Sequence, residues 1–496
     1  METIRILLYT DNSDIRKNPD PGSWGVTDLE RFIKLKLQGI ADVCFDVLNR
    51  HDVDLKTGQE INGAHKLTDG LLKQYDELWF FGYRQVNLPD AKPPEPPEPH
   101  NELECDEKEL LCDWMKTGGV LITGDHSQVD PRIENSSCDD NHDTFLTLGR
   151  AIGKEVPRAG QLRFWEGPPT NCPSPLNLER SDTFNTQEGT DPCQLDANLT
   201  FQMDEFPQTI FLVNPCFPHT IFRKPIPESN EFTPITKLPD HAHEGRIRIP
   251  ETLDNKWSGD LSPHVIARGI DKRFTDKKRI YDLLAAYDGN ESAGRIVADS
   301  SFHHYLNINL SHLPSRKGDL PEPGTPLDDI AQFYGNLAHW LAPKKIRDQI
   351  KEGLLFGLAK HPDINELKGN KPSIVGHAAR VLLNRSIGLS RVSLLFQTSE
   401  FECGLTIADH ILAYLFLEES TFPPESFLHP QNLLGQVIQY YQSSLLQLGF
   451  RELGWLDKSP LSVTEMLQQF VALQLRSNPS FAGFLNQWIL GNKTNP

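Results

Sequence analysis

The hydrophobic and polar positions in the first part of the chain alternate between short apolar runs and longer amphipathic segments. Apolar runs that stop abruptly on polar residues occur at 4–10, 77–81, 120–122 and 295–298. Such runs are typical of buried strands in a parallel sheet. The segments 26–38 and 104–116 instead carry apolar residues at helical spacing. This alternation predicts an α/β fold built on a doubly wound, mostly parallel sheet.

The pattern changes twice further along the chain. Residues 157–238 are rich in Pro, Asn, Thr and Asp, so we predict an irregular insertion that extends to about residue 262. A helix is expected from Pro326, with Thr325 as its cap. Beyond residue 345, apolar residues recur almost only at helical spacing. We therefore expect an α/β domain over 1–345, containing the insertion at about 157–262, and an α-helical domain over 346–496.

Composition excludes several classes of partner and cofactor. The formal net charge of −19 disfavours nucleic acid and anionic membranes as partners. The chain has no apolar run long enough to span a membrane and no recognisable signal peptide, and its eight cysteines are scattered. We therefore expect a cytoplasmic protein with reduced thiols. Glycine-rich phosphate-binding loops do not follow the predicted strands, so nucleotide cofactors are not indicated.

Polar residues gather where two predicted strands end. Asp125 and His126 follow the run 120–122, and His303 and His304 follow the run 295–298. Because ligands bind at the carboxyl ends of strands in open α/β sheets, we predict that these four residues form a catalytic group. An imidazole there could act as acid or base with a carboxylate orienting it, or could bind a divalent metal. The alternative for the first pair is that Asp125 or Ser127 caps a helix beside an incidental histidine. The alternative for the second is that one of His303 and His304 is buried and the other solvated.

A second polar cluster lies in the insertion. Its members, which could bind a metal, are Asp240, His241, His243 and Glu244. On an extended chain the two histidines point to the same side and could chelate one divalent ion. The alternative is a polar loop without a ligand. His219 is a weaker candidate, and the sequence leaves open whether any metal is bound.

Three segments, in this order, resemble parts of the class I glutamine amidotransferase-like superfamily, most closely its trehalose-utilisation (ThuA-like) branch. They are YDELWFFG (75–82), WMKTGGVLITGDH (114–126) and GRIVADSSFHHYLN (294–307). The resemblance covers about residues 1–345 apart from the insertion, and it implies a flavodoxin-like sheet.

The resemblance also bears on the site. Amidotransferases of the superfamily carry a nucleophilic cysteine where this chain has Asp125 or His126, and no cysteine is near. We therefore do not expect a glutamine amidotransferase. The ThuA-like branch places a histidine at that position, which matches His126. Its late-strand histidine would correspond to His303 or His304.

Two functional hypotheses follow. The first is a hydrolase or related small-molecule enzyme that uses the Asp/His cluster at the strand ends, and the resemblance implies carbohydrate-related substrates. The second is a non-catalytic scaffold or regulatory protein whose helical C-terminal region binds a protein partner. The first hypothesis requires that the predicted Asp and His side chains converge in space.

Overall fold

The structure is a computed structural model that describes a defined part of the chain. The described residues are 2–10, 15–20, 24–50, 52–53, 60–61, 65–81, 103, 105–123, 207–215, 218–226, 232–239, 263–271, 279–289, 294–311, 316–317, 320–367, 369–386, 429–439 and 442.

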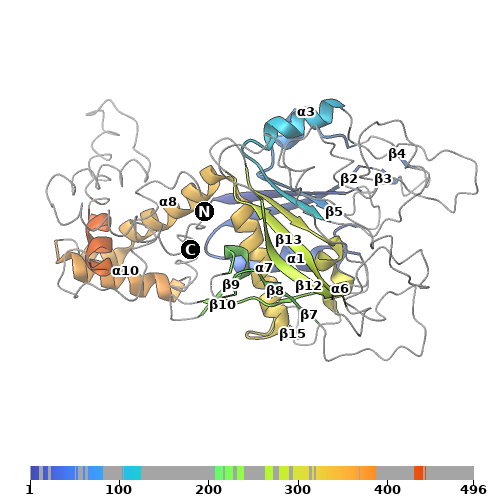
Figure 1. The fold of residues 1–496 in the computed structure, drawn as a ribbon. Coiled ribbons are helices and arrows are strands. Elements are labelled where there is room, and N and C mark those ends of the chain that lie inside the picture. Colours follow the sequence, from blue (N-terminus) through green and yellow to red (C-terminus); the bar gives the residue numbers. More distant parts are fainter. Residues whose placement is uncertain are drawn as a thin grey trace, which may run out of the picture.

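An eight-stranded sheet forms the centre of the molecule, in the order β2-β1-β5-β6-β14-β13-β12-β8 (Figure 1). The strands are β1 (Thr3–Thr10), β2 (Asp42–Asn49), β5 (Glu77–Phe81), β6 (Gly119–Thr123), β8 (Phe211–Leu212), β12 (His264–Asp271), β13 (Arg279–Tyr287) and β14 (Ile296–Asp299). The pairs from β2 to β14 are parallel, whereas β13, β12 and β8 continue the sheet in antiparallel fashion. The α/β class and the parallel part of the sheet are therefore confirmed. The order of the parallel strands is compatible with a flavodoxin-like fold.

Helices cover both faces of the sheet. One face packs against α1 (Thr27–Leu37) and α7 (Pro326–Leu341), and the other against α2 (Asp69–Leu72) and α3 (Cys105–Trp114). Side chains alternate between the two faces along each strand, so Leu121 belongs to the first cluster. Val120 and Ile122 belong to the second. This double burial explains why the strands are apolar at nearly every position.

The start of β6 packs closely against the end of α7. A Cβ atom built on Gly119 would lie 2.0 Å from the carbonyl oxygen of Leu341. Only glycine fits there, which explains one residue of the double glycine that precedes the strand. The predicted start of α7 is also confirmed, because the Thr325 side chain accepts a hydrogen bond from the Asp328 amide and Pro326 occupies the first turn.

The described parts of the predicted insertion add short elements around the sheet. They are β7 (Gln208–Thr209), η4 (Thr220–Phe222), β9 (Arg223–Pro225), β10 (Phe232–Pro234) and β11 (Lys237–Leu238). β7 pairs with β11, β9 pairs with β10, and β8 becomes an edge strand of the central sheet. The remaining short elements are β3 (Asp52–Val53), β4 (Glu60–Ile61), η5 (Phe302–Tyr305), α6 (Asn307–Ser311), β15 (Arg316–Lys317) and β16 (Leu320–Pro321).

The described residues beyond 343 are mainly helical. They form α8 (Lys344–Lys360), α9 (Pro362–Glu366), α10 (Pro372–Ser386) and a helix at 430–439. In Figure 1, α8 leads away from the sheet towards α10. Much of the α-helical domain predicted over 346–496, including residues 387–428 and 443–496, lies outside the described residues. None of the described helices is both long and apolar enough to cross a membrane.

Candidate functional site

The structure describes only part of the predicted site. Of the predicted site residues, Asp125, His126, Asp240, His241, His243 and Glu244 lie outside the described residues. His303 and His304 are described, and both are buried, with 2% and 0% of their surface exposed. The alternative in which one of these two histidines is solvated is therefore wrong.

The two predicted strand ends are neighbours. β6 and β14 are adjacent parallel strands, and Thr123 at the end of β6 is the register partner of Asp299 at the end of β14. The residues that follow each strand therefore start from the same edge of the sheet. That Asp125 and His126 converge with His303 and His304 stays a prediction, because the described part of this segment ends at Thr123.

Asp299 and His304 form a buried pair at this edge. His304 Nδ1 lies 2.8 Å from Asp299 Oδ1, and neither side chain has exposed surface. The Tyr305 hydroxyl donates to Asp299 Oδ2 at 2.7 Å, and the Ser301 amide donates to Oδ1 at 3.2 Å. Hydrogen bonds to the charged form of a carboxylate offset the cost of its burial. We call these two residues the Asp299–His304 pair.

The hydrogen-bond network assigns the His304 tautomer. A carboxylate can only accept, so His304 Nδ1 carries the proton and donates it to Asp299. His304 Nε2 then carries the lone pair, and it lies 3.2 Å from Nε2 of Gln208. The Gln208 amide also donates to the Pro239 carbonyl at 2.9 Å. A neutral imidazole that carries its lone pair on Nε2 is the form that acts as a general base, once the Gln208 amide gives way to water or a substrate hydroxyl.

The local sequence positions His304 over Asp299. Ser301 caps the short helix η5 by accepting from the His303 amide at 3.2 Å, which turns the chain back towards β14. The Tyr334 hydroxyl of α7 donates to the His304 carbonyl and anchors the other end of the turn. Burial raises the pKa of Tyr305 well above its ordinary value, and the charge of Asp299 raises it further. Tyr305 therefore stays protonated as a donor.

His303 has a different environment. Its ring contacts Trp24 edge-on at 5.3 Å between centroids and lies 4.1 Å from the Phe302 ring. The Asn309 side chain donates to its carbonyl at 2.6 Å. Of the two adjacent histidines, His304 is therefore the candidate for chemistry and His303 packs among aromatic rings.

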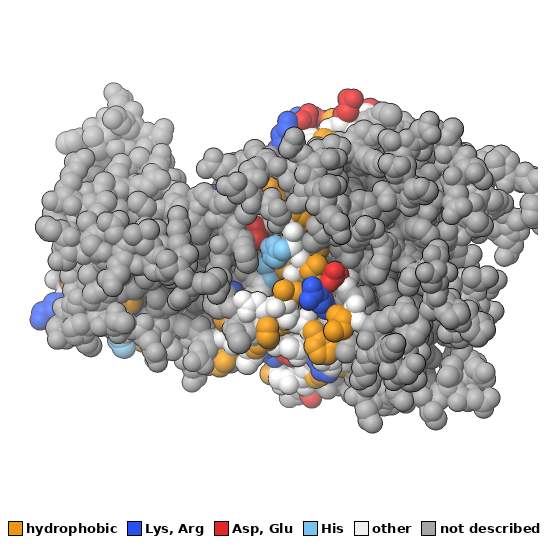
Figure 2. Space-filling model, in the orientation of Figure 1, with side chains coloured by type: hydrophobic (Ala, Val, Ile, Leu, Met, Phe, Trp, Pro, Cys, Tyr) orange, Lys and Arg blue, Asp and Glu red, His pale blue; other side chains and the backbone are white. Residues whose placement is uncertain are grey.

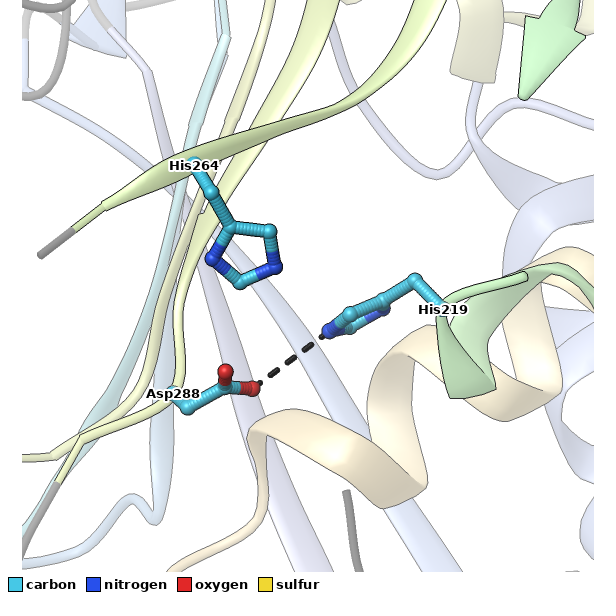
Figure 3. Close-up of side chains that lie close together, drawn as sticks. All are labelled: His219, His264 and Asp288. Atoms are coloured by element: carbon cyan, nitrogen blue, oxygen red, sulfur yellow. Dashed lines mark hydrogen bonds and ion pairs between the residues drawn. The ribbon is translucent and has the colours of Figure 1, made fainter. Parts of the chain in front are cut away.

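A second group of ionisable residues lies at the other end of the strands, where the parallel strands begin. His219 caps η4, His264 begins β12, and Asp288 follows the last residue of β13. Ligand atoms of the three side chains all lie within 4.8 Å of one another, and the side chains point towards a common space (Figure 3). In Figure 2, histidine surface is visible in the middle of the face where Figure 1 draws β13 and α7.

The electrostatics around His219 favour its neutral imidazole. Burial lowers the pKa of His219, and the nearby His264 and Arg295 act in the same direction, against the opposing effect of Asp288. Burial acts to raise the pKa of Asp288, but the contact with His219 outweighs it and the pKa is lowered. Sequence reasoning rated His219 only as a weaker candidate, and it missed His264 and Asp288. The available signal was that His264 begins the segment 264–270 and Asp288 ends the segment 280–288, both of which are rich in apolar residues.

Comparison with protein-family models and with curated proteins finds no match to the chain. The likeness to the ThuA-like branch therefore stays a prediction.

Proposed function

We propose that the chain is a hydrolase in which His304 acts as general base and Asp299 orients it. The observation that carries this proposal is the 2.8 Å contact between Asp299 Oδ1 and His304 Nδ1 at the carboxyl end of β14. In open α/β sheets this edge is where substrates bind.

The proposed chemistry moves one proton twice: His304 takes it from the attacking hydroxyl as the new bond to the substrate forms, and gives it to the leaving group as the scissile bond breaks. His304 Nε2 accepts a proton from water or from a substrate hydroxyl, and the resulting imidazolium is stabilised by Asp299 through Nδ1. Tyr305 keeps the Asp299 carboxylate in place by donating to its second oxygen. Asp125 and His126 follow Thr123, the register partner of Asp299, and we include them in the proposed site.

Access to His304 requires Gln208 to move. Gln208 belongs to β7, whose ladder with β11 contains only two residue pairs. Rotating this one side chain, or displacing so short a ladder, disturbs few hydrogen bonds. The position of the Gln208 amide at 3.2 Å from Nε2 marks where a substrate hydroxyl or water would lie.

Complete burial of the Asp299–His304 pair favours a second candidate function. In this alternative the pair only stabilises the turn after β14, and the chain is a non-catalytic scaffold whose helical C-terminal region binds a protein partner. The two functions differ in whether removing the imidazole affects a measurable reaction.

The test is a hydrolysis screen of the full chain against p-nitrophenyl esters, phosphates and glycosides. Glycosides are included because the family likeness implies carbohydrate-related substrates. We expect wild-type protein to hydrolyse one class, and His304→Gln to lower that rate by roughly 10²–10⁴-fold. His377→Gln, which changes an exposed histidine on α10, is the matched control and should leave the rate unchanged. Equal rates for wild type and His304→Gln, or hydrolysis of no substrate, would favour the scaffold.

A further inference from the structure

The three residues of the second group come together because part of the sheet is antiparallel. β13 runs opposite to β14, and Tyr287 at its end pairs with Ile296 at the start of β14. Asp288 therefore lies at the amino edge of the parallel strands, away from Asp299. His264, the first residue of β12, pairs with Ala286 at the same edge.

The geometry suits a small metal ion. His219 Nε2 lies 3.4 Å from Asp288 Oδ1, and the two histidine rings are 5.8 Å apart between centroids. Tetrahedral ligands at Zn–N and Zn–O distances of about 2.1 Å would themselves be about 3.4 Å apart. All three ligand atoms already lie within 4.8 Å of one another, so only small side-chain movements are needed.

Two of the three side chains are almost fully buried. The side chains of His219 and Asp288 are only 4% and 2% exposed, and as whole residues His219 and His264 are both intermediate in exposure. A single His–Asp hydrogen bond would need only two of these residues. Convergence of a second imidazole on the same carboxylate is the feature that a simple ion pair does not explain.

Neighbouring residues hold the ligands in place without the ion. Arg295 donates from Nε to the Asp288 carbonyl at 3.1 Å and from a terminal nitrogen to the Trp340 carbonyl at 2.9 Å. Its guanidinium also lies over the Trp340 ring, and that ring packs edge-on against His219 at 4.9 Å. Contacts of this kind orient the residues that bind the metal directly and strengthen metal affinity.

From these observations we propose that His219, His264 and Asp288 bind one divalent transition-metal ion, with Zn²⁺ as the best fit. Two imidazole nitrogens and one carboxylate oxygen favour Zn²⁺ and its neighbours over Mg²⁺ and Ca²⁺, which take oxygen ligands. Three protein ligands leave the fourth tetrahedral position to water or another ligand. The site joins η4 of the insertion to the β12–β13 hairpin, so binding should stabilise the folded chain.

The experiment measures Zn²⁺ affinity directly on the full chain after treatment with a chelator and dialysis. Zinc is titrated in competition with a chromogenic chelator, and Co²⁺ is titrated separately to record its visible absorption. We expect one site with a dissociation constant at or below the micromolar range, a tetrahedral Co²⁺ spectrum and a higher melting temperature with zinc. Millimolar Mg²⁺ should not compete. A wild-type chain that fails to bind zinc would overturn the proposal.

Variants assign the ion to these residues. His264→Ala and Asp288→Asn should each lower zinc affinity by 10-fold or more and abolish the tetrahedral Co²⁺ spectrum. His377→Ala, an exposed histidine on α10, is the matched control and should bind like wild type. His241→Ala/His243→Ala tests the other predicted cluster. Loss of binding in that variant, with retention in His264→Ala and Asp288→Asn, would overturn the assignment. Because the Asp299–His304 pair lies at the opposite edge, hydrolysis and metal binding can each fail independently.

Discussion

Asp299 at the end of β14 and Thr123 at the end of β6 are register partners in adjacent parallel strands. The Thr123 hydroxyl donates to the Phe80 carbonyl of β5 at 2.7 Å, which ties a third strand to the same edge. β14 pairs with a strand on each side, so the Asp299–His304 pair stands in the interior of the sheet. Helices pack on both faces of these strands, and changes that disturb this packing should also disturb the site.

Gly119→Ala should strongly destabilise the fold. The new Cβ would lie 2.0 Å from the Leu341 carbonyl, so α7 would have to move away from β6. We expect the free energy of unfolding, measured by urea titration, to fall by about 3 kcal/mol or more. Gly70→Ala is the matched control, since nothing lies within 4 Å of its added Cβ. It should change stability by less than about 1 kcal/mol. Equal effects of the two variants would contradict the close packing of α7.

Asp328→Asn tests the ionic contacts between α7 and its neighbours. Asp328 contacts Lys36 of α1 and lies 2.8 Å from Lys224 Nζ of β9, and these side chains are largely buried. Removing the charge leaves the buried Lys36 with a weaker partner, whereas Lys224 keeps its ion pair with Asp329, so we expect a loss of about 3 kcal/mol. Asp113→Asn removes an exposed partner of Lys116 and should cost less than about 0.5 kcal/mol. A near-neutral Asp328→Asn would show that these contacts add nothing to stability.

Acid should weaken the same contact. Burial acts to raise the pKa of Asp328, but hydrogen bonds from Lys224 and Lys36 outweigh it and the pKa lies below its ordinary value of 3.8. The contribution of this group is therefore complete above about pH 4 and is lost as the pH falls through the lowered value. Unfolding midpoints measured below pH 4 should converge for wild type and Asp328→Asn. A difference that persists undiminished at pH 2 would contradict this origin.

His339 on α7 should make stability sensitive to pH in a higher range. Burial lowers its pKa from 6.5 to about 3, and the charges of Arg347, Lys351 and Arg295 contribute. Between these values the unfolded chain binds a proton that the folded chain does not, so stability falls as the pH falls below 6.5. At most about 2 kcal/mol should be lost between pH 7 and pH 5 through this group.

Urea titrations of His339→Leu at pH 7 and pH 5 measure that contribution. The variant should lose less stability on acidification than wild type does, because leucine cannot be protonated. His377→Leu changes an exposed histidine and should keep the wild-type pH dependence. If His339→Leu and wild type lose the same stability, another group causes the acid sensitivity.

Much of the fold follows from local sequence patterns. The strands β1, β5, β6 and β14 are predictable because burial on both faces makes each a continuous apolar run. Helix α7 is predictable from Thr325 and Pro326 at its start. The antiparallel arrangement of β12 and β13 is not, because an apolar run does not encode the direction of the strand beside it.

Because strand direction cannot be predicted from apolar runs, part of the candidate sites could not be predicted either. His304 could be proposed from its position after a strand, and the partner Asp299 stands at the end of that strand. His219, His264 and Asp288 are far apart in the chain and form no local motif. They meet because β12 and β13 run against the parallel strands and bring their ends to the amino edge of the sheet.

The most direct test of the proposed function compares kcat and KM of wild type and Asp299→Asn on the best substrate of the hydrolysis screen. Asparagine can present an N–H to His304 Nδ1, which would favour the wrong tautomer and remove the charge that stabilises imidazolium. If His304 is the general base, kcat should fall by roughly 10²–10⁴-fold while KM stays within a few-fold. A folded Asp299→Asn protein with wild-type kcat would contradict the proposal.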